Sequence, residues 1–366
     1  MKIAMVFPTR ESEKAISGYS TTLVENIKKT GADIESFTYT SGSPKTLFRK
    51  LKALKKYDII HIQHEYNLLG NYGLPFFLLY FSLFFSNAKI VTTMHTILSR
   101  NEKFKGSRIK TILRKILYFT QNRWINWFSD IIVVHAGFFK DIFSKEYNVP
   151  RSKIHIFYQG IIEDVPEYNK NKIKKELGLS GPVYLIIGTL DPLHGQDIII
   201  RDANNIGKTI LVVGNPSSLN NRNSEKIEEY IEYNKKIVEE NNYEKFVRFD
   251  ISSDITDKNP LWWKYFSAAD LVLLSYRGGI GSGIFAHSIA AQKPIIASNI
   301  QYFNEIAKNF HGIKIAKSDK DYPSVIKEAM KPQNYKRMVK ECKKYLKEHG
   351  LSVVASEYKK LYTSLK

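Results

Sequence analysis

The first half of the chain alternates short apolar runs with stretches of helical spacing. Continuous runs of Ile and Val are typical of parallel strands that are covered on both faces. We predict strands at residues 3–7, 58–63, 88–95 and 130–135, and a helix over residues 19–29. Because helical segments separate these strands, the pattern is that of βαβ units and the sheet is expected to be parallel.

The same pattern starts again after Gly160. Residues 161–181 are polar and charged, and they predict a linker with one short helix. Further strands are predicted at residues 183–188, 208–214, 245–250, 270–276 and 293–298, with a helix over 230–241 and helical spacing over 335–365. The predicted fold class is α/β, with two doubly wound parallel-sheet halves. Ligands of such sheets bind at the carboxyl ends of the strands, so we expect the site in a cleft between the halves.

An uncharged apolar run covers residues 74–85. A helix that spans a bilayer needs about 20 residues, and this run has 12. We predict a buried helix between two strands, and an interfacial segment is the alternative.

Composition excludes several classes of protein. Hydrophobic residues make up 43% and charged residues 25% of the 366 residues, which is typical of a globular protein and not of a disordered one. Cys342 is the only cysteine, so a disulfide framework and a cysteine-based zinc site are excluded. The first residues lack the apolar core and cleavage site of a secretory signal, and we expect a cytoplasmic protein.

The charge is strongly basic, with 55 Lys and Arg against 36 Asp and Glu and a net charge of +19. Residues 1–160 hold 24 of the basic and 11 of the acidic residues. Such an excess favours an anionic partner, which we expect on the N-terminal half. No nucleic-acid-binding motif and no paired aromatic platform for RNA accompanies it, so nucleic acid is not the expected partner.

Two basic segments account for much of this excess. Residues 45–56 contain six basic residues and no acid, and residues 100–123 contain eight basic residues and one acid. Apolar residues of the second segment fall on one helical face, and two tryptophans follow: Ile109, Ile112, Leu113, Ile116, Leu117, Trp124 and Trp127. This combination is typical of a helix on an anionic lipid surface, which residues 45–56 and 100–127 are expected to contact. An amphipathic helix packed on its own domain is an equal alternative.

An ordered set of segments resembles the GT-B glycosyltransferases, and more narrowly the retaining family-four enzymes. The segments are KIAMVFPTR with SGYSTTLVENI, DIIHIQHEY, IVTTMHT, DIIVVHAGFFKDIF, KIHIFYQGI, AADLVLLSYR and AAQKPIIASNIQYFNEI. The resemblance implies two Rossmann-like domains, an acceptor domain over residues 1–160 and a nucleotide-sugar domain over residues 161–349. It also implies that a C-terminal helix of about residues 350–366 crosses back to the first domain.

The same resemblance implies a reaction. A sugar would move from a nucleotide diphosphate sugar to a glycan or a lipid-linked acceptor, with retention of configuration. Neither a metal nor any cofactor besides the sugar donor is expected. The location implied by the basic N-terminal half is cytoplasmic and peripheral on the membrane face.

Candidate site residues of the first half follow its strands. Gly18 precedes the predicted helix, where a glycine permits close backbone approach and a helix N-terminus favours anions; a simple turn is the alternative. His64 and Glu65 follow the second strand, as acceptor-side residues or as ordinary polar ones. A metal is not expected, because His61 and His64, three apart on an extended segment, face opposite sides.

His95 ends the third strand and is the candidate catalytic residue. In the resembled family a His at this place faces the transferred sugar. A neutral imidazole can hydrogen-bond a sugar hydroxyl or a phosphate oxygen. The alternative is a His that only caps a strand end.

The second half departs from the resembled family. Its members hold the diphosphate with a Gly-Arg and a later Lys-Gly, and here Thr189 and His194 stand at the places of the two cations. Gly279 and His287 stand where a Glu-x7-Glu pattern is expected, so both carboxylates are absent. Glu305 matches a later Glu of the family, and it either contacts a ribose or caps a helix.

A glycine-rich segment offers a replacement for the missing cations. It covers residues 278–283, follows a strand and is expected to open a helix. Backbone N–H groups around Gly281 and Gly283 would cradle a phosphate, with Ser282 as the helix cap and Arg277 as a bidentate partner. A glycine-rich turn with a surface Arg is the alternative. The missing cations also leave open a catalytically inert GT-B protein that acts as a scaffold or partner subunit.

Overall fold

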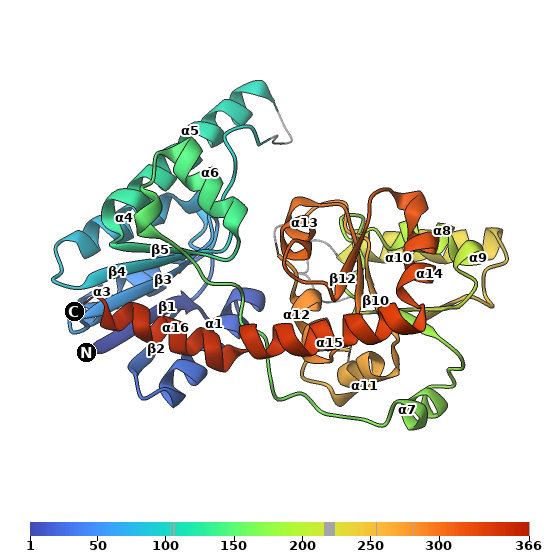
Figure 1. Cartoon of the computed structure of the whole chain (residues 1–366). Coiled ribbons are helices and arrows are strands. Elements are labelled where there is room, and N and C mark those ends of the chain that lie inside the picture. The colour runs from blue at the N-terminus through green and yellow to red at the C-terminus, as the bar shows by residue number, and fades with distance from the viewer. Residues whose placement is uncertain (103, 105–106, 216–223, 254, 280, 366) are drawn as a thin grey trace. The chain divides into compact units, whose positions relative to one another are not determined.

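The computed structural model describes residues 1–102, 104, 107–215, 224–253, 255–279 and 281–365 (Figure 1). The chain folds into two compact units. Unit 1 consists of Met1–Gly160 and Leu351–Lys366, and unit 2 consists of Ile161–Gly350. Each unit contains a six-stranded sheet whose neighbouring strands all run parallel, as the Ile- and Val-rich runs predict.

The sheet of unit 1 has the strand order β2-β1-β3-β4-β5-β6. Its strands are β1 (Lys2–Pro8), β2 (Asp33–Tyr39), β3 (Ile59–His64), β4 (Lys89–Met94), β5 (Ile131–Val134) and β6 (Ile154–Ile156). Its helices are α1 (Ala15–Lys29), α2 (Pro44–Phe48), α3 (Leu51–Leu54), α4 (Leu74–Phe84), α5 (Arg108–Phe128), α6 (Gly137–Tyr147) and α16 (Leu351–Thr363), with 3-10 turns η1 (Asn71–Gly73) and η2 (Arg151–Lys153).

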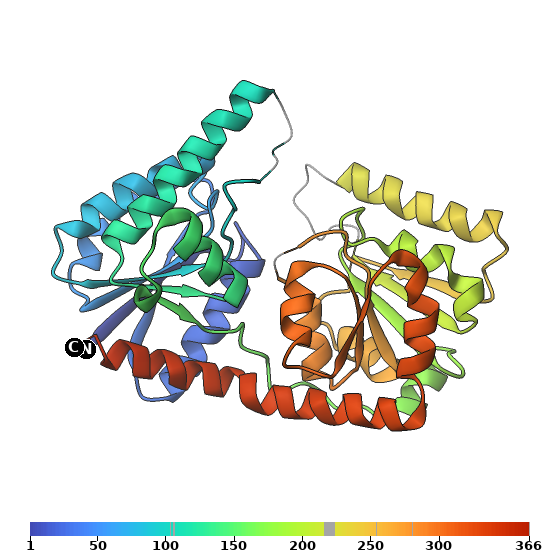
Figure 2. The same ribbon diagram turned by 45° about the horizontal axis from the view of Figure 1, so that its top comes forward.

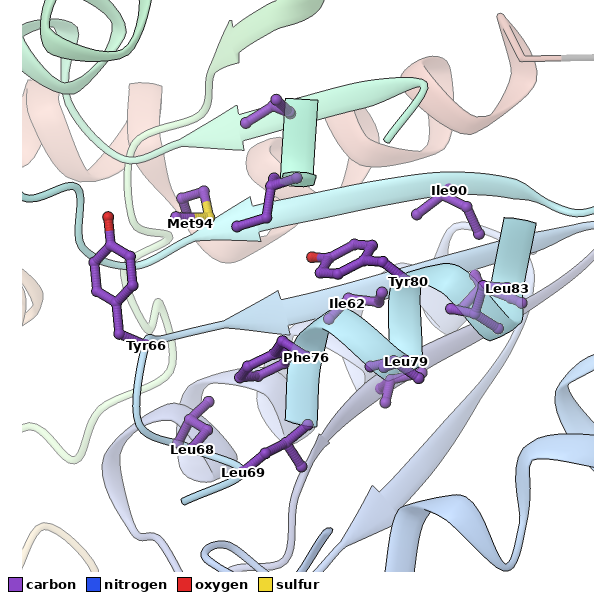
Figure 3. Packing of buried hydrophobic residues seen from close by; sticks show 14 of the residues in the cluster. Ile62, Tyr66, Leu68, Leu69, Phe76, Leu79, Tyr80, Leu83, Ile90 and Met94 are labelled. Atoms are coloured by element: carbon purple, nitrogen blue, oxygen red, sulfur yellow. The ribbon is translucent and has the colours of Figure 1, made fainter. Parts of the chain in front are cut away.

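One face of this sheet is apolar. Ile62 of β3 points toward α4, whose buried side chains Phe76, Leu79, Tyr80 and Leu83 pack against the strands (Figure 3). These side chains recur at helical spacing, so α4 covers the sheet with one stripe and leaves its other side outward.

The opposite face of the same sheet is covered by α1 and α16, and it contains a group of buried polar side chains among apolar ones. His61 Nδ1 lies 2.6 Å from the Tyr362 hydroxyl of α16, and His61 Nε2 lies 2.7 Å from Thr93 Oγ1 of β4. The Tyr358 hydroxyl adds a longer contact of 3.4 Å to Thr93. All four side chains are completely buried, so each depends on the others for its hydrogen bonds.

The sheet of unit 2 has the order β12-β11-β10-β7-β8-β9. Its strands are β7 (Val183–Gly188), β8 (Thr209–Gly214), β9 (Val247–Ile251), β10 (Leu271–Leu274), β11 (Ile295–Ser298) and β12 (Ile313–Ala316). Its helices are α7 (Lys170–Glu176), α8 (Gln196–Arg201), α9 (Ala203–Ile206), α10 (Ser224–Glu240), α11 (Pro260–Ala268), α12 (Gly283–Ala290), α13 (Gln301–Ala307), α14 (Tyr322–Ala329) and α15 (Pro332–His349), with the turn η3 (Asp319–Asp321).

Strand order fixes where ligands of each sheet are expected. In unit 1 the order reverses between β1 and β3, and in unit 2 it reverses between β7 and β10. Loops that leave such a pair of strands turn to opposite faces of the sheet and open a crevice at the carboxyl ends. The segments after β3, β7 and β10 are those that supply most of the predicted site residues.

Three strands, β2, β6 and β12, were not predicted from the sequence. All three lie at an edge of their sheet, where one side of the strand has no neighbour. Their side chains are partly exposed, so they lack the continuous apolar runs that mark the interior strands. The predicted linker has its one short helix, α7, and the helical spacing over residues 335–365 is divided between α15 and α16.

The apolar run at residues 74–85 is a helix, but it is not fully buried. Leu78 is 61% exposed and Phe84 is 63% exposed. The prediction of a buried helix is therefore wrong for one of its sides, because a helix on the outer layer of a sheet buries only one stripe. In the part of the chain that the structure describes, no helix is both long enough and apolar enough to cross a membrane.

Tyr362→Phe should destabilise the protein. The change removes the hydroxyl partner of His61 Nδ1 and leaves a buried polar group unsatisfied, which costs about 1–3 kcal/mol. Urea denaturation measures the loss. The matched control is Tyr72→Phe, because Tyr72 is 52% exposed and its change should stay within about 0.5 kcal/mol. An equal effect of the two changes would contradict the role given to His61.

Candidate functional site

Polar side chains gather where three strands of unit 1 end at the same edge of the sheet. Gln63 lies near the end of β3, and His95 and His135 follow the last residues of β4 and β5. His95 Nε2 lies 2.8 Å from Gln63 Oε1, and the two imidazole rings are 5.1 Å apart. Tyr19 of α1 stands edge-on to both rings, at 6.1 and 5.7 Å. We call these four residues the His95 cluster.

The hydrogen bonds assign the protons of His95. Gln63 Oε1 can only accept, so His95 Nε2 carries the hydrogen and Nδ1 is the acceptor of the neutral ring. Burial, and next the neighbouring His135, hold the pKa of His95 well below 6.5. Burial also lowers the pKa of His135, against the opposing effect of its 2.8 Å hydrogen bond to the Phe157 carbonyl. Both rings are therefore neutral at physiological pH.

His64 does not border this cluster. It is the last residue of β3, its side chain is completely buried on the α4 face, and its ring lies 4.1 Å from that of Phe76. Burial lowers the pKa of His64 to about 3, and neither ring nitrogen has a hydrogen-bond partner among the described residues. The expectation that His64 lies in a loop beside the acceptor is corrected, because alternation along β3 turns it away from His61.

Glu65 follows β3 and is half-buried. Its Oε1 accepts the backbone N–H of Tyr66 at 3.1 Å. Burial raises the pKa of Glu65, against the lowering effect of hydrogen bonds from Thr96 and from the Tyr66 backbone. Glu65 therefore stays a candidate on the acceptor side.

Gly18 lies inside α1 and not in the loop before it. The helix begins at Ala15, and the Gly18 N–H donates to the Lys14 carbonyl at 3.0 Å. The N–H groups of Ala15 and Ser17 donate to the Glu13 carboxylate at 2.9 and 3.0 Å. This corrects the predicted helix start, and the anion at the N-terminus of α1 is the protein's own Glu13.

In unit 2, the loop after β7 is tightly folded. Asp191 Oδ1 accepts the His194 N–H at 3.0 Å and lies 2.8 Å from His194 Nδ1. Gly195 has φ of +64°, and a Cβ there would overlap the Ser275 carbonyl oxygen, so the loop needs glycine to approach β10. The Thr189 carbonyl accepts from Gln196 Nε2 at 2.9 Å. Thr189 and His194 thus lie in one loop at the switch point of the sheet.

Arg277 follows β10 and is held by a carboxylate of its own unit. Its Nη1 and Nη2 donate to the two Asp197 oxygens at 2.8 and 2.7 Å, and Nη1 also reaches the Pro192 carbonyl at 2.8 Å. Burial would raise the pKa of Asp197, but hydrogen bonds from Arg277 and Tyr230 outweigh it and the pKa is lowered. Arg277 is therefore not the free cation that the sequence analysis expects, because Asp197 already balances its charge.

The glycine-rich segment opens α12, as predicted. Ser282 is the N-cap, and its Oγ accepts the Phe285 N–H at 3.0 Å. The first N–H groups of a helix have no partner within it, and a Cβ at Gly281 or Gly283 would meet no atom within 4 Å. The start of α12 therefore presents backbone donors beside open space. The segment also contains residue 280, which lies outside the described residues.

The three remaining positions that the sequence analysis singled out in unit 2, Gly279, His287 and Glu305, have different surroundings. Glu305 is half-buried on α13. Gly279 has φ of +148°, a backbone conformation that favours glycine. His287 lies among aromatic rings, 5.3 Å from that of Trp263, and burial lowers its pKa to about 4 against the raising effect of Asp257. His287 is thus a neutral packing residue and not a substitute for a carboxylate.

Sequence reasoning missed Gln63, His135 and Asp197. His135 carried a usable signal, since it follows a buried strand in the same way as His95. Asp197 carried none, because its partner Arg277 is 80 positions away in the sequence. Within the residues that the structure describes, no group of three or more His, Cys, Asp and Glu side chains is arranged to hold a metal ion.

Breaking the Arg277–Asp197 pair should destabilise unit 2. Arg277→Leu leaves the carboxylate buried, at a cost of about 1–2 kcal/mol once the 43% exposure of the Arg277 side chain is allowed for. The double variant Arg277→Leu/Asp197→Asn should lose less free energy of unfolding than the two single variants lose together. A double-mutant cycle measured by urea denaturation tests this. Strict additivity would contradict the pairing.

The same pair predicts a pH dependence. Because the folded-state pKa of Asp197 is lowered, its stabilisation is present above the ordinary value of 3.8 and is lost as the pH falls through the folded-state pKa. The stability difference between the wild type and Asp197→Asn should therefore shrink as the pH falls below 3.8.

Comparison with known families gives a match over the N-terminal part of the chain. Residues 6–165 match the family model described as Glycosyltransferase Family 4. No protein with a curated description matches the chain in sequence.

Solved structures match over nearly the whole chain. HepE from Anabaena in complex with UDP has a TM-score of 0.73 and 13% identity, and the match covers 100% of both chains. Sucrose-phosphate synthase from Thermosynechococcus elongatus has a TM-score of 0.73 and 15% identity, over 100% of this chain and 99% of that one. WaaG, a glycosyltransferase involved in lipopolysaccharide biosynthesis, has a TM-score of 0.63 and 12% identity, over 97% and 98% of the two chains.

Identities this low establish the fold and not the substrate. The two parallel sheets and their agreement with these structures confirm the architecture expected from the sequence. The chain therefore has the GT-B glycosyltransferase fold, and its residues 6–165 match Glycosyltransferase Family 4, as the ordered sequence motifs predict.

Proposed function

We propose that the protein is a glycosyltransferase that moves a sugar from a nucleotide diphosphate sugar to a glycan or lipid-linked acceptor, with retention of configuration. The observation that carries the proposal is the His95 cluster, a group of neutral polar side chains at the carboxyl edge of a parallel sheet. HepE, which shares the fold, has been solved with UDP and with UDP-glucose. A nucleotide sugar is therefore the donor that the proposal names.

Unit 1 would supply contacts to the transferred sugar. His95 Nε2 is held by Gln63, so the ring cannot rotate freely and Nδ1 keeps a lone pair for a sugar hydroxyl. A neutral ring suits this contact, because it accepts a hydrogen bond that an imidazolium could not. Glu65 is the candidate on the acceptor side.

Unit 2 would hold the diphosphate. The N–H groups around Gly281 and Gly283 are suited to phosphate oxygens, since the start of a helix favours negative charge. Arg277 acts here as a positioning residue, because its pairing with Asp197 ties the loop after β7 to the end of β10. Thr189, His194 and Glu305 complete the donor-side candidates, whereas Gly18 is left out because its N–H is used within α1.

The reaction implied is a front-face displacement. The bond between the anomeric carbon and the diphosphate oxygen breaks, and a bond to the acceptor oxygen forms on the same face. The proton of the acceptor hydroxyl passes to the departing diphosphate, which becomes the base. Fixed backbone dipoles at the phosphate would stabilise the charge that develops there. No metal takes part in this proposal.

The peripheral location is part of the same proposal. The basic residues within 45–56 lie on exposed positions of α2, α3 and the adjoining turns, where they can face an anionic surface. A catalytically inert GT-B scaffold is the competing function. It is supported by the pairing of Arg277 with Asp197, because that pair leaves the diphosphate without the expected free cation.

Gly283→Val should abolish most nucleotide binding. The new side chain meets no protein atom within 4 Å of its Cβ, so the fold tolerates it, but it fills the space before the N–H donors. Loss of a charge-assisted hydrogen bond corresponds to roughly 10- to 150-fold weaker binding. Thermal shift with UDP, GDP, ADP and their sugars measures this, because a ligand of the folded state raises the melting temperature.

His95→Ala is the reciprocal variant. It should keep nucleotide binding and lose turnover, because its expected contact is the sugar. If the wild type binds no nucleotide or nucleotide sugar at millimolar concentration, the scaffold function is favoured over the enzyme. If it binds one and Gly283→Val has no effect, the function stands and the diphosphate lies elsewhere.

A further inference from the structure

Helix α4 leaves a continuous apolar stripe on its outer side. Leu74, Leu78, Phe81 and Phe85 recur at helical spacing and are between 49% and 66% exposed. They alternate at helical spacing with the stripe that α4 buries on the sheet, which Figure 3 shows. Neither α4 nor the residue that follows it carries a charge. A soluble surface seldom exposes so many large apolar side chains side by side.

Helix α5 continues this surface. It packs along α4, with Trp124 Nε1 donating to the Phe77 carbonyl at 3.2 Å and the Phe84 and Phe128 rings 5.3 Å apart. Its buried residues, Gln121, Asn122 and Ile125, all lie in its second half. The first half runs out beyond the end of the sheet of unit 1 (Figure 2).

This projecting half of α5 carries four large apolar side chains that its own unit leaves mostly exposed. Ile109, Ile112, Leu113 and Ile116 are between 56% and 72% exposed. Other side chains of this half do pack on their own unit, with Arg114 over the Tyr72 ring at 5.3 Å and the Tyr118 and Tyr66 rings 4.7 Å apart. Tertiary packing normally stabilises a helix in water, and the four apolar side chains stay mostly exposed beside it. An amphipathic helix packed on its own domain, the alternative left open by the sequence, therefore does not account for these four exposed side chains.

The charge beside these apolar residues has one sign. Helix α5 carries five basic residues and no acidic residue, and α4 carries neither. Lys110 and Lys115 form no ion pair within the described part of the chain. Arg123 lies over the Trp127 ring at 5.6 Å, and Trp127 is 60% exposed. Apolar side chains with Trp and unpaired cations match an anionic lipid surface, where headgroups meet the charges and acyl chains meet the apolar residues.

We propose that the outer face of α4 and α5 inserts into an anionic lipid bilayer. We call this surface the α4–α5 face, made of the exposed apolar residues of the two helices with Lys110, Lys115 and Arg123 at its margin. The inference rests on the proposed function in one respect, since it makes a bilayer the place where the acceptor is met. Insertion of apolar side chains differs from electrostatic attraction to the membrane surface, because it persists when salt screens the charges.

Sedimentation of the full chain with vesicles tests the proposal. Vesicles of phosphatidylcholine with an equal share of phosphatidylglycerol should bind the protein, and vesicles of phosphatidylcholine alone should bind it more weakly. Leu78→Gln and Leu113→Gln should each weaken binding by roughly tenfold or more, because each leucine, 61% exposed, would otherwise be buried in lipid.

Leu193→Gln is the matched control. Leu193 is a comparably exposed leucine, at 54%, but it belongs to unit 2, so its change should leave vesicle binding as in the wild type. Lys110→Glu with Lys115→Glu should weaken binding by about fivefold or more per residue at low salt. At high salt this charge effect should fade, whereas the effect of Leu113→Gln should remain.

Three results would overturn the proposal. The first is no binding to anionic vesicles at low salt, and the second is an equal loss with Leu193→Gln. The third is a lipid-free dimer that Leu78→Gln and Leu113→Gln dissociate, which would assign the face to a second copy of the chain. Nucleotide-induced thermal shift should be unchanged in the α4 and α5 variants, so failure of the proposed function would be detected separately.

Discussion

Burial of polar side chains on one face of the first sheet is the constraint on which unit 1 depends. His61, Gln63 and Thr93 point from interior strands into a region without solvent, and an unsatisfied polar group there would cost more than a hydrogen bond returns. Tyr362 and Tyr358 of α16 supply the missing partners. Helix α16 therefore completes the buried hydrogen bonds of the first sheet, although it comes last in the sequence.

The same network sets the geometry of the candidate site. His61 accepts from Thr93 and lies 3.4 Å from Gln63 Nε2, which leaves Gln63 Oε1 to accept from His95. The orientation of the amide thus decides which nitrogen of His95 carries a proton. In unit 2 the Arg277–Asp197 pair has a comparable place, since it joins the segment after β10 to the first turn of α8 at the switch point of the sheet. In both units a buried hydrogen-bonded partner fixes the orientation of a candidate residue.

The interior strands and the edge strand β9 were predictable from the sequence, whereas the edge strands β2, β6 and β12 were not. The runs at β5 and β7 are apolar on both faces because helices cover both, whereas β2 and β12 expose part of each face. His95 was predictable from its place after a strand. The pairing of Arg277 was not, because the sequence reveals a cation but not the carboxylate that the fold brings to it. Nor did the sequence reveal that Glu13 occupies the start of α1.

Unit 1 is built from both ends of the chain, so it cannot be completed until synthesis of the chain is nearly finished. Residues 1–160 leave the ribosome first, but α16 follows only after the whole of unit 2 has been made. At about 5–20 residues per second, the face of the first sheet that α16 covers stays without that helix for on the order of ten seconds or more. During that interval His61 has no tyrosine partner, and the strands beneath α16 face water or a chaperone. Unit 2, continuous in sequence, can complete its core before the unit that precedes it.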